Sequence, residues 1–374
     1  MISRRSFLAT PALPLAFAAC GTRAGGYRGY AFVANEDGQA IAAVDLQVLA
    51  VARHIALDAS PTQVIAAQTR TAIYALTPAT GSVHEIQSDH LSFRRKATVA
   101  STAVSISLDT KERALYVLTK DPRALVRLSL DSLTPEWSVP LKDDVEDFAI
   151  TPNGNFAAIS GGGAVRLVNL ASRTVGDPLG EGDFGAVRFL SDSNTLIAAD
   201  RGARRLSLYD AASSKLITHL PVAVRPDNLC FNRPTEPGNT EGGQLFVTGE
   251  GMDGVVIVYP YHTPEVGETV LGGPAPGPMG ASGDFLFIAS PQAGAVTIMG
   301  IRKRQVIGVV AVGSDPGFVA VTQDDQFALV LNRKSGDMAV LRVGSIAPNR
   351  LKKAALLTVI PVGSRPVSAD VRGV

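Results

Sequence analysis

The stretch DPGFVAVTQDDQFALVLNRKSGDMAVLRV, from Asp315 to Val343, decides the fold of this chain. After Pro316, two valines alternate with small residues, as in a strand whose two faces differ. Residues 327–331 are apolar throughout and indicate a second strand that is buried on both faces. Turn-forming residues then lead into a third strand over 338–343. The stretch therefore predicts three consecutive strands joined by short turns.

This pattern recurs along almost the whole chain. In seven copies an apolar pair stands three and five residues after a marker residue, and the copy at Pro278 is weaker; the marker is proline in five copies and another residue in three. Successive markers lie 40, 44, 39, 42, 52, 38 and 50 residues apart, close to the roughly 40–50 residues of a four-stranded propeller blade. Turn chemistry within each interval favours a β-propeller over a solenoid of helix pairs. The eight markers are Pro61, Ser101, Val145, Phe184, Pro226, Pro278, Pro316 and Pro366.

The two ends of the repeat array are out of phase. Three strands are predicted before the first marker, whereas the last marker is followed by a single strand over 367–371. If this last strand becomes the innermost strand of the blade that begins at Tyr30, the ring closes through its own termini and has no open edge. We therefore predict an all-β propeller of four-stranded blades over residues 30–374, with eight blades favoured and seven as the alternative.

The composition fits one large domain and gives no support to a nucleic-acid or anionic-membrane partner. The chain has 374 residues, 46% of them hydrophobic, with 36 glycines and 23 prolines for many tight turns. Its net charge of +1 gives no reason to expect a nucleic-acid surface or an anionic-membrane surface, because both need a clustered basic field. We expect a monomer with no nucleic-acid partner.

Residues 1–20 are predicted to be an export signal. Ser3-Arg4-Arg5-Ser6-Phe7-Leu8 resembles the twin-arginine motif, and the apolar run 9–19 is too short for a permanent membrane helix. The segment 17–20, Phe-Ala-Ala-Cys, resembles a bacterial lipobox with Phe where Leu is usual. Cys20 would then be the lipidated first residue of the mature protein, and plain signal-peptidase cleavage is the alternative. Residues 21–29 form a tether, so we expect a periplasmic location with the membrane contacted only through a lipid anchor.

Three segments carry a family resemblance: FVANEDGQAIAAVDL (32–46), LYVLTKDPRALVRLSLD (115–131) and FALVLNRKSGDMAVLRV (327–343). They resemble the YVTN-type β-propeller family, and the resemblance extends over nearly the whole mature chain. It implies the propeller fold. It does not imply one function, because proteins with such repeats include binding proteins, cofactor-site builders and hydrolases.

The residues that commonly carry chemistry do not form a catalytic pattern. None of the five histidines stands beside a marker: His54 and His219 are predicted on outermost strands, and His84, His90 and His262 near strand ends or outer connections. Cys230 is the only thiol besides Cys20 and is predicted to be a small buried core residue. We therefore predict no disulfide, no metal, no cofactor and no catalytic residue.

Polar residues gather in two sets of turns that a propeller brings to one face. One set precedes the innermost strands, and the other connects the second and third strands. Arginine forks among them suit a carboxylate or phosphate, while a solvated, salt-bridged loop face is the alternative interpretation. The candidate ligand-binding residues are Arg225, Asp227, Arg365, Asp315, Asp144, Asp183, Arg201, Glu250, Asn35 and Asn332.

Two copies of one tripeptide pattern place arginine directly before a marker proline, at Arg225 and Arg365. Proline forces the preceding residue into an extended conformation, which predicts that both guanidiniums overlook the channel mouth. The arginines either take an anionic group of a ligand or, for Arg225, pair with Asp227 as a structural contact. The insertion at 232–243 leaves two interpretations as well: a loop that shapes a site, or a tolerated surface insertion.

The sequence thus predicts an exported propeller that binds a small polar ligand or an envelope protein. The alternative is a hydrolase of the propeller lactonase type or a quinoprotein-like accessory chain. The family resemblance permits this alternative without matching any catalytic residue.

Overall fold

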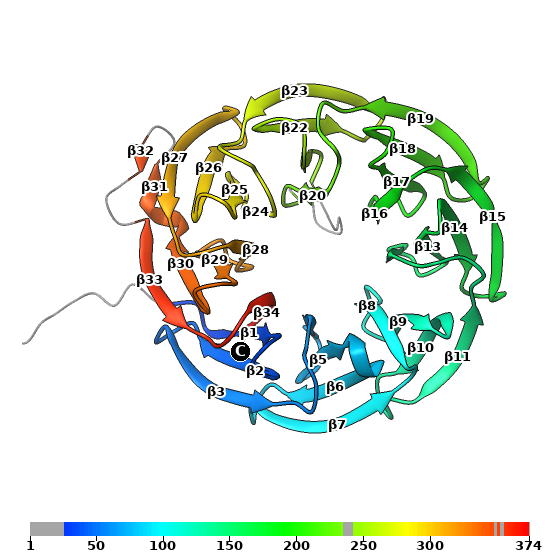
Figure 1. The fold of residues 1–374 in the computed structure, drawn as a ribbon, viewed down its shortest axis with the longest axis horizontal. Coiled ribbons are helices and arrows are strands. Elements are labelled where there is room, and N and C mark those ends of the chain that lie inside the picture. The colour runs from blue at the N-terminus through cyan, green and yellow to red at the C-terminus, as the bar shows by residue number, and fades with distance from the viewer. Residues whose placement is uncertain (1–25, 235–241, 348–349, 352–354, 374) are drawn as a thin grey trace, which may run out of the picture.

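Eight four-stranded antiparallel sheets stand around a ring in the computed structural model, which describes residues 26–234, 242–347, 350–351 and 355–373 (Figure 1). The predicted eight-bladed propeller is confirmed, and the seven-bladed alternative is wrong. Helix in the described residues is confined to two 3₁₀ turns, η1 (Pro78–Thr80) and η2 (Val343–Ser345). No helix among these residues has the length and apolar character needed to cross a membrane.

The first four blades have the following strands, in order from the ring axis outward. Blade 1 consists of β34 (Pro366–Gly373), β1 (Gly29–Asn35), β2 (Ala40–Asp45) and β3 (Ala50–Ala56). Blade 2 consists of β4 (Gln63–Ala66), β5 (Ala72–Thr77), β6 (Ser82–Gln87) and β7 (Ser92–Thr98). Blade 3 consists of β8 (Thr102–Leu108), β9 (Ala114–Asp121), β10 (Arg123–Ser129) and β11 (Pro135–Pro140). Blade 4 consists of β12 (Asp147–Ile150), β13 (Phe156–Gly161), β14 (Ala164–Asn169) and β15 (Thr174–Glu181).

The other four blades follow the same order. Blade 5 consists of β16 (Phe184–Phe189), β17 (Thr195–Asp200), β18 (Arg205–Asp210) and β19 (Lys215–Pro221). Blade 6 consists of β20 (Asn228–Phe231), β21 (Leu245–Thr248), β22 (Gly254–Tyr259) and β23 (Glu265–Leu271). Blade 7 consists of β24 (Met279–Ala281), β25 (Phe285–Ser290), β26 (Ala295–Gly300) and β27 (Gln305–Ala311). Blade 8 consists of β28 (Pro316–Val321), β29 (Phe327–Asn332), β30 (Asp337–Arg342) and β33 (Leu356–Pro361), with the small hairpin β31 (Ile346–Ala347) and β32 (Arg350–Leu351) before β33.

The strand order defines two faces of the ring. Because neighbouring strands are antiparallel, the turns between second and third strands lie on the same face as the connections between blades, and we call this face A. The turns between first and second strands and between third and fourth strands lie on the opposite face, face B. The ion pair between Arg70, which follows β4, and Asp131, which follows β10, joins two loops of face B.

The core lies between neighbouring blades. The second and third strands are buried almost completely, as in β29, whose six residues are all buried, because each blade is covered on both sides by its neighbours. This explains why these strands are continuous apolar runs without alternation. The outermost strands alternate between exposed and partly buried residues, as in β27.

The ring closes where the two ends of the chain meet. β34 pairs with β1 in antiparallel register, with Ala369 opposite Val33. The last strand therefore supplies the innermost strand of the blade that begins the ring, as the phase of the repeats predicts. The unpaired edges of the innermost strands are partly capped by side chains of the preceding blade. The backbone N–H of Ala66 donates to Asp370 (2.8 Å), and that of Val187 donates to Asp147 (3.1 Å).

Each blade also holds one buried polar side chain at or near the end of its second strand on face A. None of these eight side chains is more than 1% exposed. Most donate a hydrogen bond to a backbone carbonyl of a face A loop, as Thr248 does to Gly277 (2.7 Å). The eight residues are Asn35, Thr77, Thr119, Ser160, Asp200, Thr248, Ser290 and Asn332.

One histidine lies elsewhere than predicted. His84 is in the third strand of blade 2 and is 1% exposed, so its prediction near a strand end or outer connection is wrong. Its Nε2 lies 2.8 Å from Asp58 in the connection between blades 1 and 2, and this partner permits its burial. His54 and His219 are on the outermost strands β3 and β19, as predicted.

Candidate functional site

The ten predicted ligand-binding residues all lie on face A, but they do not form one cluster. They are distributed over blades 1, 4, 5, 6 and 8, in the connections that precede innermost strands or at the ends of second strands. Only Asp315 and Arg365 line a common recess. The sequence pattern therefore located a rim, and the structure divides this rim into separate polar groups.

Arg225 is held within its own blade. Its Nε lies 2.8 Å from Oδ1 of Asp227, and its Nη1 lies 3.2 Å from Glu250. The hydrogen bond to Asp227 raises the pKa of the Arg225 guanidinium above its ordinary value. The ion pair between Arg225 and Asp227, one of the two interpretations of the sequence pattern, is thus present. The side chain remains 46% exposed, so a ligand could still reach its free edge.

Arg201 and Arg333 occupy equivalent places in blades 5 and 8. Each guanidinium lies over a glycine of the innermost strand: a Cβ added to Gly317 would lie 2.3 Å from Nε of Arg333, and one added to Gly185 would lie 3.2 Å from Nε of Arg201. Glycine leaves room there for the arginine, because an added side chain at 317 would displace the guanidinium of Arg333, and one at 185 would press on that of Arg201.

The two arginines differ in their acidic partners. Arg333 pairs with Asp315 at 2.7 Å. Arg201 pairs with Asp183 at 2.8 Å and with Glu146 at 2.6 Å, and the hydrogen bond to Glu146 raises its pKa. Because Arg201 has two acidic partners and Arg333 has one, the arginine charge at the rim of blade 5 is more fully neutralised than that of blade 8.

Asn35 and Asn332 belong to the buried polar layer beneath the rim. Nδ2 of Asn35 donates to the carbonyl of Val362 (2.8 Å), and Nδ2 of Asn332 donates to that of Val312 (3.3 Å) and to Asp337 (2.6 Å). Among the described residues, neither side-chain Oδ1 finds a donor. At 1% and 0% exposure these amides support face A loops from below and do not present a side chain at its surface.

A recess of about 680 Å³ opens on face A between blades 8 and 1. It brings together three cationic side chains, Arg333, Lys334 and Arg365, and two carboxylates, Asp37 and Asp315. Arg365 is 51% exposed, and its nearest carboxylates are Glu36 at 3.2 Å and Asp37 at 3.9 Å. Glu36, which pairs with Arg365, brings the nearby carboxylates to the same number as the cations, and the two guanidiniums keep N–H donors beyond these ion pairs, which suits a carboxylate or phosphate. The other lining residues are Ser335, Gly336, Pro361, Gly363 and Ser364.

A second face A recess of about 570 Å³ lies in blade 3 at its border with blade 4. It is lined by Thr102, Lys120, Asp121, Arg123 and Asp144. Arg123 pairs with the predicted Asp144 at 2.6 Å. The second recess has one guanidinium, which pairs with Asp144, whereas the first recess has two, so the first recess is the better candidate for an anionic ligand. Arg123 itself was absent from the sequence prediction because it begins a third strand and does not belong to either set of turns.

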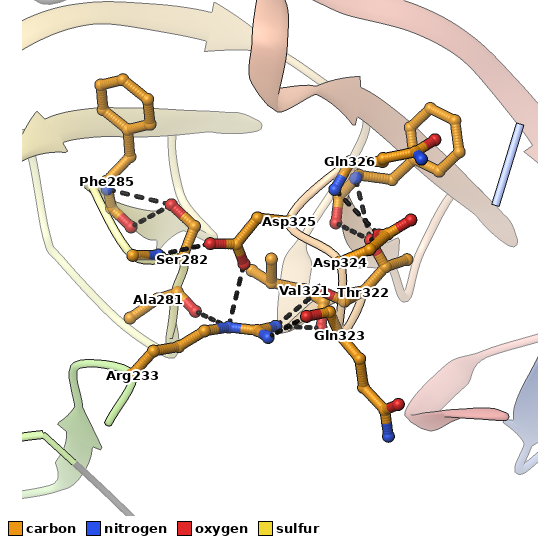
Figure 2. A network of polar contacts seen from close by, with 12 residues as sticks. Arg233, Ala281, Ser282, Phe285, Val321, Thr322, Gln323, Asp324, Asp325 and Gln326 are labelled. Carbon is orange, nitrogen blue, oxygen red and sulfur yellow. Dashed lines mark hydrogen bonds and ion pairs between the residues drawn. The ribbon is translucent and has the colours of Figure 1, made fainter. Parts of the chain in front are cut away.

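The insertion after β20 contributes a set of inter-blade hydrogen bonds on face B, all made by Arg233. Arg233 donates from Nη2 to the carbonyls of Val321 (2.9 Å) and Thr322 (2.6 Å), and from Nη1 to that of Gln323 (2.8 Å). Its Nε lies 3.0 Å from Asp325 and donates to Ala281 at 3.4 Å. Figure 2 shows the guanidinium lying between these groups. A residue of blade 6 thus binds loops of blades 7 and 8, so the base of the insertion is structural. Residues 235–241, the rest of the predicted insertion, lie outside the described residues.

Groups that could attack a substrate are unfavourably placed. Burial raises the pKa of the Cys230 thiol to about 12, because the side chain packs among apolar residues between blades 6 and 7. The hydroxyl of Ser160 donates to the carbonyl of Gly185 at 2.6 Å. Within the described residues, no group of three or more His, Cys, Asp or Glu could hold a metal ion.

Neither a family model nor a curated protein matches this sequence. Solved structures do match. The dihydro-heme d1 dehydrogenase NirN, solved in complex with DHE, has a TM-score of 0.74 at 11% identity, over 91% of this chain and 75% of that one. Apo AztD from Citrobacter koseri has a TM-score of 0.68 at 14% identity, over 92% of this chain and 98% of that one.

The hydrazine synthase of Kuenenia stuttgartiensis has a TM-score of 0.55 at 15% identity, over 83% of this chain and 91% of the other. At such low identities, structural similarity supports a common fold and not a common activity. The chain is therefore an eight-bladed β-propeller with a polar rim on face A.

Proposed function

We propose that this chain is an exported, lipid-anchored propeller of the YVTN-repeat type that binds a small ligand carrying a carboxylate or phosphate on face A. An envelope protein that presents such a group is the alternative occupant. The export signal and the lipobox at Cys20 support export and lipid anchoring, and both lie outside the described residues. The repeated strands and the propeller fold support the family.

One observation carries the binding proposal: the recess between blades 8 and 1 is lined by two guanidiniums that come from different blades, those of Arg333 and Arg365. Arg333 approaches the recess from the end of a second strand, and Arg365 approaches it from the connection before β34. An anion placed between them would receive charge-assisted hydrogen bonds from two different blades, and each such bond is stronger than a neutral one. The rim of blade 5 fits less well, because two carboxylates hold Arg201 at 2.6 and 2.8 Å, whereas the nearest carboxylate to Arg365 lies at 3.2 Å.

Titration calorimetry with citrate and inorganic phosphate tests the proposal. We expect the wild-type chain to bind at least one of these anions, with an affinity that falls as salt is added. Arg333→Ala and Arg365→Ala should weaken binding, and Arg365→Ala should leave stability nearly unchanged, because its ion pair is largely exposed, whereas the half-buried pair of Arg333 with Asp315 adds a small loss of stability. Arg70→Ala is the matched control, since it removes a similarly paired arginine from face B. Absence of binding to the wild type, or an equal loss in the control, would refute an anion site in this recess.

The hydrolase and accessory-chain alternatives lack a supporting observation on face A. A hydrolase needs an activated nucleophile or a metal-bound water. Cys230 is kept protonated by its apolar surroundings, and the carboxylates of the rim are engaged with arginines. The rim geometry therefore favours binding.

A further inference from the structure

The two blades that border the recess on face A have the same backbone at their rims. In blade 8, the N–H of Arg333, directly after β29, donates to the carbonyl of Asp315 (3.0 Å). In blade 1, the N–H of Glu36, directly after β1, donates to the carbonyl of Arg365 (3.0 Å). Asp315 and Arg365 also share a positive φ, of 60° and 53°, although each precedes a proline. Arg365 therefore lacks the extended backbone that the sequence predicts, and the two rims can be compared residue by residue.

The charges at these equivalent positions are inverted. The connection before the innermost strand ends with an acid in blade 8, Asp315, and with a base in blade 1, Arg365. The turn after the second strand begins with two bases in blade 8, at 333 and 334, and with two acids in blade 1, at 36 and 37. Each rim holds its own ion pair, Arg333 with Asp315 at 2.7 Å and Arg365 with Glu36 at 3.2 Å. The two ion pairs therefore run in opposite directions from connection to turn.

Backbone hydrogen bonds join the two sides of the recess. The N–H groups of Val362 and Gly363, in the connection that leads to Arg365, donate to the carbonyl of Gly336 in the turn of blade 8 (3.1 and 3.2 Å). Gly336 and Gly363 both line the recess. A Cβ added to Gly336 would lie 2.8 Å from the carbonyl oxygen of Gly363, so the two segments touch without a side chain between them. The inverted charges of the two blades are thus presented by one hydrogen-bonded framework.

Asp37 is the least engaged carboxylate of the recess. Its side chain is 62% exposed, and its nearest cation among the described residues is Arg365, with 3.9 Å between Oδ1 and Nη1. Asp315, by contrast, is 21% exposed and lies 2.7 Å from Arg333. A ligand with anionic groups alone would bring like charge close to Asp37, which opposes its binding to Arg365. A ligand that also carries a cationic group would satisfy both side chains.

We propose that the recess takes a zwitterion, a molecule with a primary ammonium a few bonds from a carboxylate or phosphate, as in a free amino acid. The proposal rests on the anion site proposed above and names the class of its ligand. Arg333 and Arg365 bind the acidic group, and Asp37 accepts hydrogen bonds from the ammonium. Because Arg365 and Asp37 are only 3.9 Å apart, the two groups that they bind must lie close together in the ligand.

Titration calorimetry of the full chain with two matched pairs of molecules tests the proposal. Aspartate differs from succinate by an ammonium in place of a hydrogen, and phosphoethanolamine differs from ethyl phosphate in the same way. The ammonium reduces the negative charge of the molecule, so a merely cationic surface would prefer succinate and ethyl phosphate. We expect the zwitterion of at least one pair to bind about fivefold more tightly than its partner, and that pair identifies the acidic group.

Equal or weaker binding of both zwitterions overturns the proposal and leaves the anion site standing. If none of the four molecules binds, the anion site proposed above is wrong as well.

A charge variant tests the role of Asp37. Asp37→Asn should abolish the preference for the zwitterion without weakening its partner, because it removes the carboxylate and keeps both guanidiniums. Arg365→Ala should weaken both members of the pair. Asp131→Asn is the matched control, since it removes an exposed carboxylate that lies 2.8 Å from Arg70 on face B, and it should change neither affinity. A preference that survives in Asp37→Asn, or that is lost equally in Asp131→Asn, overturns the assignment of the ammonium to Asp37.

Discussion

Nδ2 of Asn35 donates a 2.8 Å hydrogen bond to the carbonyl of Val362, which lies 327 residues further along the chain. The bond joins the end of the first strand to the loop that leads into the last one, so it supports the closure of the ring. Asn332 makes the corresponding bond to Val312 within blade 8, where both residues are close in sequence.

Asn35→Ala should lower the free energy of unfolding by about 1–3 kcal/mol, because it leaves the Val362 carbonyl without its buried donor. Urea denaturation monitored by fluorescence measures the change. Gln47→Ala serves as the control, since Gln47 is exposed and its side chain lies in a surface turn. A midpoint equal to that of the wild type would show that the bond does not contribute to stability.

Removal of residues 366–374 should prevent formation of a stable ring. The deletion takes away β34 and leaves β1 and β4 without the strand between them, and the loss should exceed the roughly 5–15 kcal/mol of a typical domain. Circular dichroism during heating checks this outcome. An unchanged melting temperature in the truncated chain would contradict closure through β34.

Arg233→Ala should destabilise the ring by about 2–3 kcal/mol, since charged donors to three carbonyls are lost together with the pair to Asp325. Arg233→Lys should recover only part of this, because an ammonium cannot reproduce the planar fork. Arg53→Ala, at an exposed position on β3, is the control. If lysine restores full stability, the effect depends on charge alone and not on the geometry in Figure 2.

Stability should fall as the pH drops from 7 to 5. Burial lowers the pKa of His84 below 6.5, so the unfolded chain binds protons more readily than the folded one in this range. Asp58, whose pKa is lowered to about 2 by hydrogen bonds from Lys96 and His84, adds a further loss below about pH 4. His84→Gln should flatten the dependence between pH 7 and 5, as measured by chemical denaturation at each pH. His219, whose pKa is also lowered by burial, is retained in both chains, so an equal slope in the two would exclude His84 as the cause.

The blade count was predictable because its signal is local and repeated. Each marker and its apolar pair report one innermost strand, and the strand order in all eight blades agrees with the markers. The position of the final strand followed from phase alone, since the chain carries three strands before the first marker and one after the last. Such periodicity survives even where the proline has been replaced, as at Ser101.

The contacts of the rim and of face B could not be predicted in the same way, because they join residues that the sequence repeat does not relate. Arg233 reaches a carbonyl 90 residues away, and no pattern in the sequence marks that partner. The burial of His84 depends on its contact with Asp58 in another segment, so it could not be predicted from the sequence of its own strand. Asn35 and Asn332 were assigned to the surface by their place beside a turn, whereas the last residue of a second strand lies below the tip of the turn and is covered by it.

The eight buried polar residues at the ends of the second strands have a consequence for how this protein can change. Most of these residues hold a face A loop from below, as Thr248 holds the loop of Gly277, and they do so without the side chain at the tip of the loop. Substitutions at the tips can therefore accumulate at little cost to folding. A ring built in this way can acquire a new specificity by exchange of a few surface side chains, while the framework that presents them is inherited unchanged.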